Sequence, residues 1–367
     1  MKIWWTAPSA PSCISGSEEG ARMKKQHVLV ILLLWAALTA AAWFTPAEAV
    51  SDSERRPLAQ LPEMSLSALS GGKFMSDFEK YALDQFPLRD GFRTLKSLFH
   101  QYVLMHGDNN GIYLHEGYAA GQEYPLSEDS VEHAMERLNA VYDKYLADSR
   151  VFMAVIPDKG YYLAEEAGQL AMDYETLFAR VENAMPWAEH ISLAQSLSLE
   201  DYYRTDTHWR QEKLPETAAL ICRALGIGEP QAEDYTPVAL ERPFYGVYYG
   251  QAALPMEPET MYILESDLLS ECTVYDYETG KTGSVYDMTK LDSRDLYDVY
   301  LSGARALLTV ENPNAGTDRE LIVFRDSYGS SLCLCWYRAM PECRWWISAI
   351  SVATCWISTW TSTDRMC

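Results

Sequence analysis

A long run without charged residues near the N-terminus sets the first limit on how this chain can fold. The run extends from Val28 to Phe44 and follows the basic pair Lys24 and Lys25. As a helix with a rise of about 1.5 Å per residue it covers about 25 Å, slightly less than the roughly 30 Å hydrocarbon core of a bilayer. Because basic residues mark the cytoplasmic side, we expect residues 28–44 to cross the membrane and the chain after them to lie outside the cytoplasm.

Residues 23–48 fit two kinds of targeting segment. Ala47-Glu48-Ala49 resembles the small-x-small site of a cleaved signal peptide, which would give a secreted protein. An uncleaved signal anchor would instead give a single-pass membrane protein with an extracytoplasmic domain. A buried core helix is disfavoured because the run has no polar face.

Residues 1–22 show no pattern of their own. Met23-Lys24-Lys25 is a typical start for a targeting segment, and Glu18-Glu19-Gly20 back-translates to a purine run like a ribosome-binding site. We therefore expect translation to begin at Met23 and residues 1–22 to be an extension upstream of the true start.

Residues 333–367 also differ from the rest of the chain. They contain five of the eight cysteines and five tryptophans, without helical or strand periodicity. In the frame that starts at the third base of each codon, Trp345-Trp346-Ile347 becomes an apolar residue followed by Val and Asp, a typical strand ending. We interpret residues 333–367 as a frameshifted tail that replaces the C-terminal strands of the domain.

Composition narrows the class of protein between these ends. A hydrophobic share of 48% and an aromatic share of 12% exclude a disordered chain. The formal charge of −22 argues against nucleic acid as a partner, since binding to phosphates needs clustered basic residues. No Cys-x-x-Cys pair or Cys/His cluster has zinc spacing, so we expect neither a metal site nor a disulfide framework, and no cofactor. Cys222 lies on an apolar helical stripe and is expected to be a buried free thiol.

Residues 49–120 are expected to form a linker and a helical arm. Ser51–Ser70 is polar and punctuated by proline. Apolar residues at helical spacing in Asp77–Phe99, interrupted at Phe86-Pro87, predict two short helices. The Gly- and Asn-rich stretch Gly107–Tyr118 predicts a turn and a hairpin.

Residues 121–332 alternate between helical and strand patterns. The apolar runs Val151–Ile156 and Leu321–Phe324 are typical of strands buried on both faces. Helical stripes are expected after Ser127, a candidate N-cap, and in residues 177–184 and 214–225, the last ending at Gly226. This alternation predicts an α/β domain with a mostly parallel sheet between two layers of helices. Residues 230–316 are less regular and are expected to form loops and edge strands.

Ser327 follows the second predicted strand directly. Ligands of open α/β sheets bind at the carboxyl ends of strands, where a serine on a sharp turn can present its hydroxyl. The motif Asp326-Ser327-Tyr328-Gly329 is not Gly-x-Ser-x-Gly, so it is no α/β-hydrolase elbow. Taken alone, the motif is more typical of a turn that caps a helix than of a nucleophile.

A serine nucleophile needs a base, and the base needs a carboxylate that orients it. His208 is the best candidate base, because Asp206 lies two residues before it and would share its face on an extended strand. An ordinary loop before a helix would have the same sequence. Together with Ser327, however, the pair indicates a split Asp/His/Ser centre.

The combination of Asp206-Thr207-His208-Trp209 with Arg325-Asp326-Ser327-Tyr328-Gly329 resembles the DHHW family, which is similar to the SGNH-like domains of alginate O-acetyltransferase-type proteins. The segments 84–89 and 155–159 fit this resemblance, which covers about residues 50–332. It implies an SGNH-hydrolase-like three-layer fold, with Ser327 as nucleophile, His208 as general base and Asp206 as orienting carboxylate.

The chain departs from the family pattern in three places. Thr207 replaces the first histidine, and we expect its side chain to point away from the site. Ser302-Gly303-Ala304 stands where relatives carry Gly-Asn, which leaves the oxyanion donors open. The family also continues beyond the serine with a helix, a strand and an Asp-x-Arg-Tyr-like segment, which the shifted reading frame would permit.

Four residues that flank the triad are candidate substrate contacts: Lys159, Trp209, Arg325 and Tyr328. For Lys159 and Arg325 the alternative is a partly exposed residue in an ion pair. The tyrosines of Tyr245–Tyr249 could stack on sugar rings or pack as an edge strand.

The resemblance implies serine-dependent transfer of an acyl group, expected to be acetyl, on a cell-surface polysaccharide. A transferase needs an acyl supply across the membrane, and the resemblance suggests a polytopic membrane acyltransferase as partner. Two alternatives remain: a carbohydrate esterase of the same fold, and a non-catalytic, membrane-anchored protein that binds glycans or acts as a scaffold.

Overall fold

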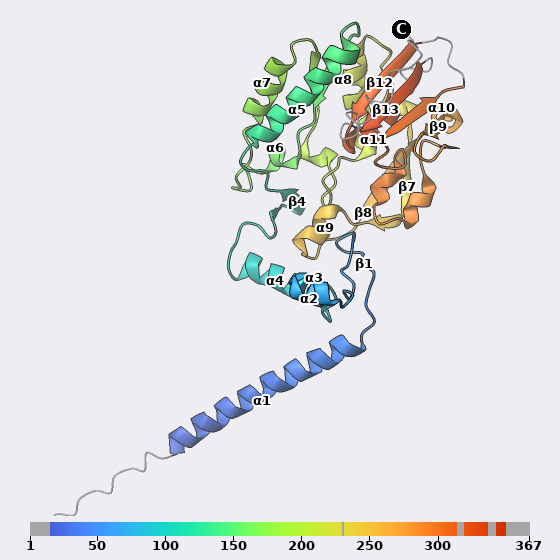
Figure 1. Ribbon diagram of the computed structural model, residues 1–367. Coiled ribbons are helices and arrows are strands. Elements are labelled where there is room, and N and C mark those ends of the chain that lie inside the picture. The colour runs from blue at the N-terminus through green and yellow to red at the C-terminus, as the bar shows by residue number, and fades with distance from the viewer. Residues whose placement is uncertain (1–14, 230, 314–318, 337–342, 350–367) are drawn as a thin grey trace, which may run out of the picture. The chain divides into compact units, whose positions relative to one another are not determined.

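The apolar run forms the C-terminal part of one long helix, α1 (Ser15–Phe44), in the computed structural model (Figure 1). The structure describes residues 15–229, 231–313, 319–336 and 343–349. Within α1, Lys25–Phe44 spans 20 residues with a mean hydropathy of 2.1, and none of it is buried. The helix is thus long and apolar enough to cross a membrane, as a signal sequence would also be.

The chain divides into two compact units, which we describe separately. Met1–Ser51 and Arg56–Phe92 form the first unit, and Asp52–Arg55 and Arg93–Cys367 form the second. After α1, the first unit contains β1 (Val50–Ser51), β2 (Arg56–Pro57), α2 (Leu66–Ser70), α3 (Lys73–Asp84) and the start of α4 (Arg89–Tyr102). The two helices predicted on either side of Phe86-Pro87 are therefore confirmed as α3 and α4.

The second unit continues with alternating helices and strands. Its first half contains β3 (Ile112–His115), β4 (Tyr118–Gly121), α5 (Glu128–Val141) with a π-helical turn (Tyr142–Leu146), β5 (Phe152–Val155), α6 (Lys159–Leu163), α7 (Tyr174–Ala184), β6 (Glu189–Ser192) and α8 (Pro215–Leu225). Its second half contains β7 (Thr236–Phe244), α9 (Val247–Ala252), β8 (Glu259–Glu265), α10 (Asp267–Glu271), β9 (Thr273–Asp276), β10 (Lys281–Gly283), β11 (Leu307–Glu311), β12 (Arg319–Arg325), α11 (Tyr328–Cys335) and β13 (Cys343–Ala349). Short 3-10 helices lie at Leu199–Asp201, Gln211–Lys213, Ala232–Asp234, Met288–Asp292 and Leu296–Val299.

The strands pair in a way that the apolar runs did not predict. β5 with β6 and β12 with β13 are parallel, whereas the other pairs between described strands are antiparallel. The largest sheet has the order β10-β9-β11-β13-β12, and the others have two strands each. The expected mostly parallel sheet is therefore wrong for the described residues, because an apolar run shows that a strand is buried and not which way its neighbour runs.

The C-terminal tail contributes to the largest sheet. β13 lies between β11 and β12, with Trp345 opposite Leu321 in the parallel register and Ile347 opposite Leu308 in the antiparallel one. Helix α11 also continues to Cys335, past the expected boundary at residue 332. The expectation that the chain has no regular structure after residue 332 is therefore wrong for residues 333–335 and 343–349. The frameshift itself stays a prediction, and residues 337–342 and 350–367 lie outside the described part of the chain.

Helix positions agree better with the sequence patterns. Helix α8 ends at Gly226, which adopts a left-handed conformation with φ +70°. Cys222 on this helix is a buried free thiol, as predicted. Ser127 stands at the N-cap of α5, but its side chain makes no capping hydrogen bond there. Strand β5 is half-buried rather than covered on both faces.

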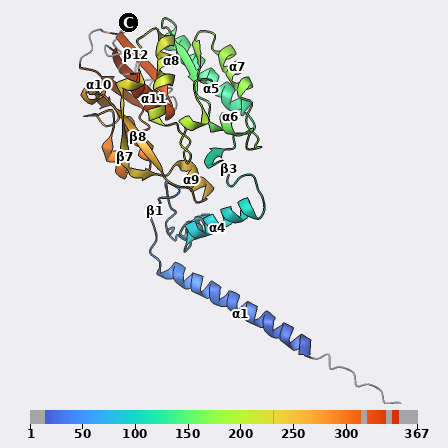
Figure 2. The same ribbon diagram turned by 180° about the vertical axis from the view of Figure 1, so that it is seen from behind.

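The main core of the second unit lies against α8 and α11. Buried residues of these helices pack with residues of strands β8, β9 and β11. A smaller apolar cluster joins α5, α7 and β5. In both views α5, α6 and α7 group on one side of this unit and the sheet with β12 and β13 on the other (Figures 1 and 2). Ser327 lies at the junction of β12 and α11, beside the main core.

Candidate active site

The Asp206-Thr207-His208 segment is a tight loop and not an extended strand. An antiparallel bridge between Tyr202 and Trp209 closes it. Oδ1 of Asp206 accepts hydrogen bonds from both the backbone N–H of His208 (3.0 Å) and its Nδ1 (2.6 Å). The carboxylate and the imidazole therefore meet through a side-chain-to-backbone turn, and the shared strand face expected from the sequence is wrong.

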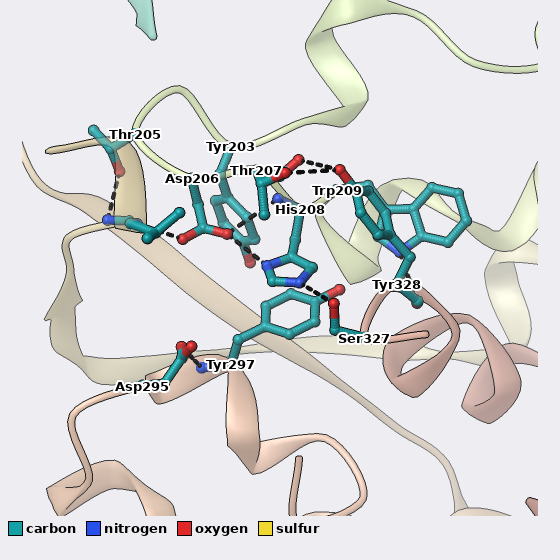
Figure 3. A network of polar contacts seen from close by, with 12 residues as sticks. Tyr203, Thr205, Asp206, Thr207, His208, Trp209, Asp295, Tyr297, Ser327 and Tyr328 are labelled. Atoms are coloured by element: carbon teal, nitrogen blue, oxygen red, sulfur yellow. Dashed lines mark hydrogen bonds and ion pairs between the residues drawn. The ribbon is translucent and has the colours of Figure 1, made fainter. Parts of the chain in front are cut away.

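The other ring nitrogen of His208 reaches Ser327. Its Nε2 lies 2.7 Å from Ser327 Oγ, and the three side chains of Asp206, His208 and Ser327 form one line of hydrogen bonds (Figure 3). Because Asp206 accepts from Nδ1, this network assigns the proton to Nδ1 and leaves Nε2 free to accept from the serine hydroxyl. His208 and Asp206 are buried, whereas Ser327 is exposed at the start of α11.

Asp206 is held as a carboxylate inside the protein. Its Oδ2 accepts a hydrogen bond from the backbone N–H of Val247 (2.7 Å) and lies 3.8 Å from Nη1 of Arg55. Burial alone would raise the pKa of Asp206, but the charge and hydrogen bonds of His208 together with the charge of Arg55 outweigh burial and lower it. The carboxyl is therefore ionised at any pH where the protein would work.

The loop is fastened to the rest of the unit through Thr205. Glu259 on β8 accepts from the backbone N–H groups of Arg204 and Thr205 and from the hydroxyl of Thr205, each at 2.8 Å. On the other side, Gly246 approaches so closely that a Cβ there would lie 2.2 Å from the carbonyl carbon and oxygen of Thr205. Only a residue without a side chain can occupy that position without moving the loop.

Lys159 supports this loop from the interior and does not face the site. It is 1% exposed, and its Nζ donates to the carbonyl oxygens of Tyr203 (2.9 Å), Arg204 (3.3 Å) and Ala119. Burial lowers the pKa of Lys159 to about 7, although the charges of nearby carboxylates, that of Asp206 foremost, act in the opposite direction. Both readings from the sequence, a substrate contact and a partly exposed ion pair, are wrong because Lys159 has no access to solvent.

Trp209 connects the two motifs. Its indole Nε1 donates to the carbonyl oxygen of Tyr328 (3.1 Å) and lies 3.0 Å from Oγ of Ser331. The side chain is fully buried, so its assignment as a substrate contact is wrong. Its role in the structure is to fix the first turn of α11, and with it Ser327, against the loop that carries His208.

Arg325 is also an interior residue, with 4% exposure. Its guanidinium donates to the carbonyl oxygens of Gly303 (3.1 Å) and Asp326 (3.1 Å) and to the hydroxyl of Ser330. Neither the substrate contact nor the exposed ion pair expected from the sequence is found. Arg325 instead ties the β12–α11 turn to Gly303, whose left-handed backbone (φ +75°) packs so closely on Asp298 that a Cβ would lie 2.0 Å from its Oδ1.

Tyr328 lies next to the serine and is half-buried. Its hydroxyl donates to the carbonyl oxygen of Thr207 (2.7 Å) and lies 3.0 Å from the hydroxyl of that residue. The Thr207 side chain therefore points toward the Ser327 turn, and the expectation that it points away is wrong. Substrate contact by the exposed part of the Tyr328 ring stays a prediction.

Sequence patterns did not reveal Tyr297, which touches the base directly. Its ring stacks on the imidazole of His208 with centroids 3.9 Å apart and an angle of 11° between the planes (Figure 3). Its hydroxyl lies 2.7 Å from Oγ of Ser331, and Asp295 caps the short helix that carries it by accepting from the Tyr297 N–H (3.0 Å). One tyrosine among the 24 in the chain has no local mark that would single it out.

Among the described residues, one group of side chains has the composition of a metal site. Ligand atoms of His115, Glu116 and Glu166 lie within 4.8 Å of one another, but Glu116 and Glu166 are exposed and His115 is half-buried. Exposed acidic groups of this kind are common without an ion, so no metal is assigned. Cys222, Cys272, Cys333 and Cys335 are free and buried.

Asp206, His208 and Ser327 thus lie in one line of hydrogen bonds at the junction of β12 and α11. No family model and no curated protein matches the sequence. Among solved structures, a DHHW family protein from Eubacterium siraeum DSM 15702 is similar with a TM-score of 0.54 and 18% identity, covering 66% of this chain and 83% of that one. Bacillus cereus PatB1 with a sulfonyl adduct is similar with a TM-score of 0.50 and 14% identity, covering 65% and 84%.

The O-acetyltransferase domain of Pseudomonas putida AlgJ has a TM-score of 0.38 at 14% identity, covering 65% of this chain and 78% of that one. The resemblance to the DHHW family that the two motifs indicate is thus confirmed at the level of the fold. At these identities the fold is what the similarity shows.

Proposed function

We propose that this protein is a serine-dependent acyltransferase that moves an acyl group, most simply acetyl, on a polysaccharide outside the cytoplasm. The observation that carries the proposal is the continuous line of hydrogen bonds from Asp206 through His208 to the exposed hydroxyl of Ser327. A buried carboxylate, an imidazole with a free acceptor nitrogen and an accessible hydroxyl are the parts that acyl transfer through a covalent acyl-serine requires.

Each step follows from this arrangement. Ser327 Oγ attacks the acyl carbonyl while its proton passes to Nε2 of His208. The bond to the donor oxygen then breaks, and that oxygen takes the proton from Nε2. A hydroxyl of the acceptor next gives its proton to Nε2 and attacks the acyl-serine, and the departing Ser327 oxygen recovers the proton. Asp206 stabilises the imidazolium formed in both halves without taking a proton itself.

Hydrolysis uses the same residues with water as the acceptor, so an esterase of this fold is the alternative enzyme. Exclusion of water from the acyl-serine would favour a sugar hydroxyl. The ratio of transfer to hydrolysis in the presence of a short oligosaccharide is the measurement that separates the two activities.

Helix α1 supports the proposed location. Lys25–Phe44 is long and apolar enough to hold the enzyme at the outer face of a membrane, where a polysaccharide and a polytopic membrane acyltransferase would be its partners. If the segment is cleaved as a signal peptide, the same chemistry takes place in a secreted protein.

The proposal can be tested with the full chain purified in detergent. Since the PatB1 structure carries a sulfonyl adduct, an aryl sulfonyl fluoride is a suitable probe. We expect it to label Ser327, and we expect the protein to release the phenol from an aryl acetate. Ser327→Ala should abolish both reactions, and Ser330→Ala should not abolish the labelling.

Asp206→Asn gives an independent check. An amide can no longer fix the Nδ1–H tautomer, and comparable changes in serine hydrolases lower kcat by about 10⁴-fold. A folded wild-type protein that is not labelled and shows no turnover would refute the enzyme and favour a non-catalytic, glycan-binding or scaffold protein.

A further inference from the structure

We propose that Arg55 is a positioning residue of this active site, which links the carboxylate behind His208 to the tyrosine stacked on it. The inference rests on the proposed function and adds a residue that neither motif contains. Arg55 ends the segment Asp52–Arg55, which follows the apolar helix in sequence but belongs to the second unit. We call residues 52–55 the strap.

The guanidinium of Arg55 lies between two carboxylates. Its Nη1 is 3.0 Å from Oδ1 of Asp295 and 3.8 Å from Oδ2 of Asp206. Its Nη2 donates to the carbonyl oxygen of Tyr245, and its Cζ lies 5.7 Å from the centre of the Phe244 ring. With a side chain that is 12% exposed, Arg55 is largely removed from solvent, where such ion pairs are weakly screened.

The two carboxylates are connected to the His208 imidazole in different ways. Asp206 accepts the hydrogen bond from Nδ1–H of His208, and Asp295 caps the short helix on which Tyr297 stacks against the His208 ring. A single cation therefore compensates the charge behind the imidazole and fixes the turn that holds its face. Without that cation, the negative charges of Asp206 and Asp295 would repel each other with no positive charge between them.

The strap is held in place by its own contacts. Gly250 lies so close to it that a Cβ would be 1.8 Å from the carbonyl oxygen of Ser53. Arg93 bridges the two segments, since its Nη2 lies 3.3 Å from Glu54 and donates to the Gly250 carbonyl at 2.6 Å. Arg55 itself has a left-handed backbone with φ +53°, which aims its side chain from a sharp turn. Because these contacts hold the strap in place, the Arg55 side chain can fix the positions of Asp206 and Asp295 as well as compensate their charge.

Other ionisable groups also face this centre. Asp298 interacts with Arg55, and Tyr297 lies on the imidazole face. Three further groups interact with Asp206: Lys159, Tyr248 and Tyr328. Arg55→Gln removes a positive charge from this set, which makes protonation of the centre easier. We therefore expect the acid limb of the pH–rate profile to move to higher pH.

The test compares Arg55→Gln and Arg55→Lys in the full chain. We expect Arg55→Gln to lower kcat for aryl acetate about 10-fold with little change in KM, to shift the acid limb upward, and to slow labelling of Ser327 to the same extent. Arg55→Lys should restore the wild-type pH profile, and added guanidinium should raise the rate of Arg55→Ala. Arg242→Gln is the matched control, because Arg242 pairs with the exposed Asp292 and should leave all values unchanged.

A folded Arg55→Gln protein with the wild-type rate and pH profile would overturn the proposal. An equal loss in Arg55→Lys and Arg55→Gln with an unchanged pH profile would also overturn it, since charge would then be irrelevant. A wild type without turnover that depends on Ser327 would refute the proposed function but not the positioning role of Arg55. NMR titration of the His208 imidazole in wild type and Arg55→Gln then still tests Arg55, with a shift expected and no shift contradicting it.

Discussion

The ring of Tyr297 lies against the imidazole of His208 at a centroid distance of 3.9 Å. Asp206 fixes the imidazole at its edge, whereas Tyr297 covers one of its faces. In the proposed reaction, an imidazole held from both directions keeps Nε2 aligned with the serine hydroxyl without reorganisation. Three segments, each remote from the others in sequence, are needed to build this one orientation.

This stacking gives the first prediction. Tyr297→Leu removes the aromatic contact and is expected to lower kcat about 2- to 10-fold, in line with the 0.5–1.5 kcal/mol typical of ring pairs. Tyr297→Phe keeps the stacking and loses the contact of the hydroxyl with Ser331, so it should retain most of the rate while melting at a lower temperature. Equal rates in the two variants would show that stacking does not position the base. Aryl acetate turnover and thermal melting together provide the measurement.

Gly246 gives the second prediction. Gly246→Ala places a methyl group against the backbone of Thr205, which must move and carry Asp206 with it. We expect a loss of about 2 kcal/mol in stability, as for other overpacked sites, and a loss of activity larger than the melting temperature alone explains. Gly283→Ala is the control, since its Cβ would meet nothing within 4 Å. Wild-type activity in Gly246→Ala would contradict the close approach.

Lys159 gives the third prediction. Lys159→Met keeps the volume but leaves three carbonyl oxygens without their donor, so we expect a loss of stability of about 3 kcal/mol. The exposed Lys213→Met should leave the stability unchanged. Chemical denaturation monitored by circular dichroism provides the comparison. A stable Lys159→Met protein with a raised KM would instead support the substrate contact that the sequence suggested.

Asp84 gives a prediction about pH in the first unit. Hydrogen bonding from Arg56, opposed by burial and helped by the Ala59 N–H and Arg89, lowers the pKa of Asp84 from 3.8 to about 2. Because the unfolded carboxyl binds its proton first, the stabilisation is present above pH 4 and is lost as the pH falls toward 2.

Asp84→Asn should therefore destabilise the first unit by about 1 to 2 kcal/mol at pH 7, with the gap to wild type closing between pH 4 and 2. Hydrogen exchange of residues 56–92, compared at matched pH, measures this gap. Asp77→Asn, whose side chain pairs with Lys80 at the surface, is the control. If the stability difference between Asp84→Asn and wild type stays constant across this range, the partners of Asp84 do not lower its pKa.

The two motifs were sufficient to predict that Asp206, His208 and Ser327 lie together, because an acid, a base and a hydroxyl in compact motifs are chemically distinctive. The local geometry was wrong, since an i, i+2 pair meets equally well across a tight turn as along a strand. The roles of Lys159 and Arg325 were also wrong. A charged residue is usually exposed, and its burial depends on carbonyl groups from distant segments that no local pattern reveals.

The same reason explains what was missed. Arg55 and Tyr297 reach His208 or its partner from segments far from either motif, and Glu259 supports the loop from another strand. For the fold, helix ends such as Gly226 were readable because a left-handed cap has a residue preference. Strand direction could not be predicted in this way, since β11 and β13 are antiparallel although both are apolar.

The strap has a practical consequence for anyone who wishes to work with a soluble version of this protein. The second unit is discontinuous in sequence, because Asp52–Arg55 belongs to it while residues 56–92 do not. Deleting everything before Arg93 would remove the apolar helix α1 but also the cation beside Asp206. A shortened gene should therefore begin at or before Asp52, a start that maturation after Ala49 would leave intact.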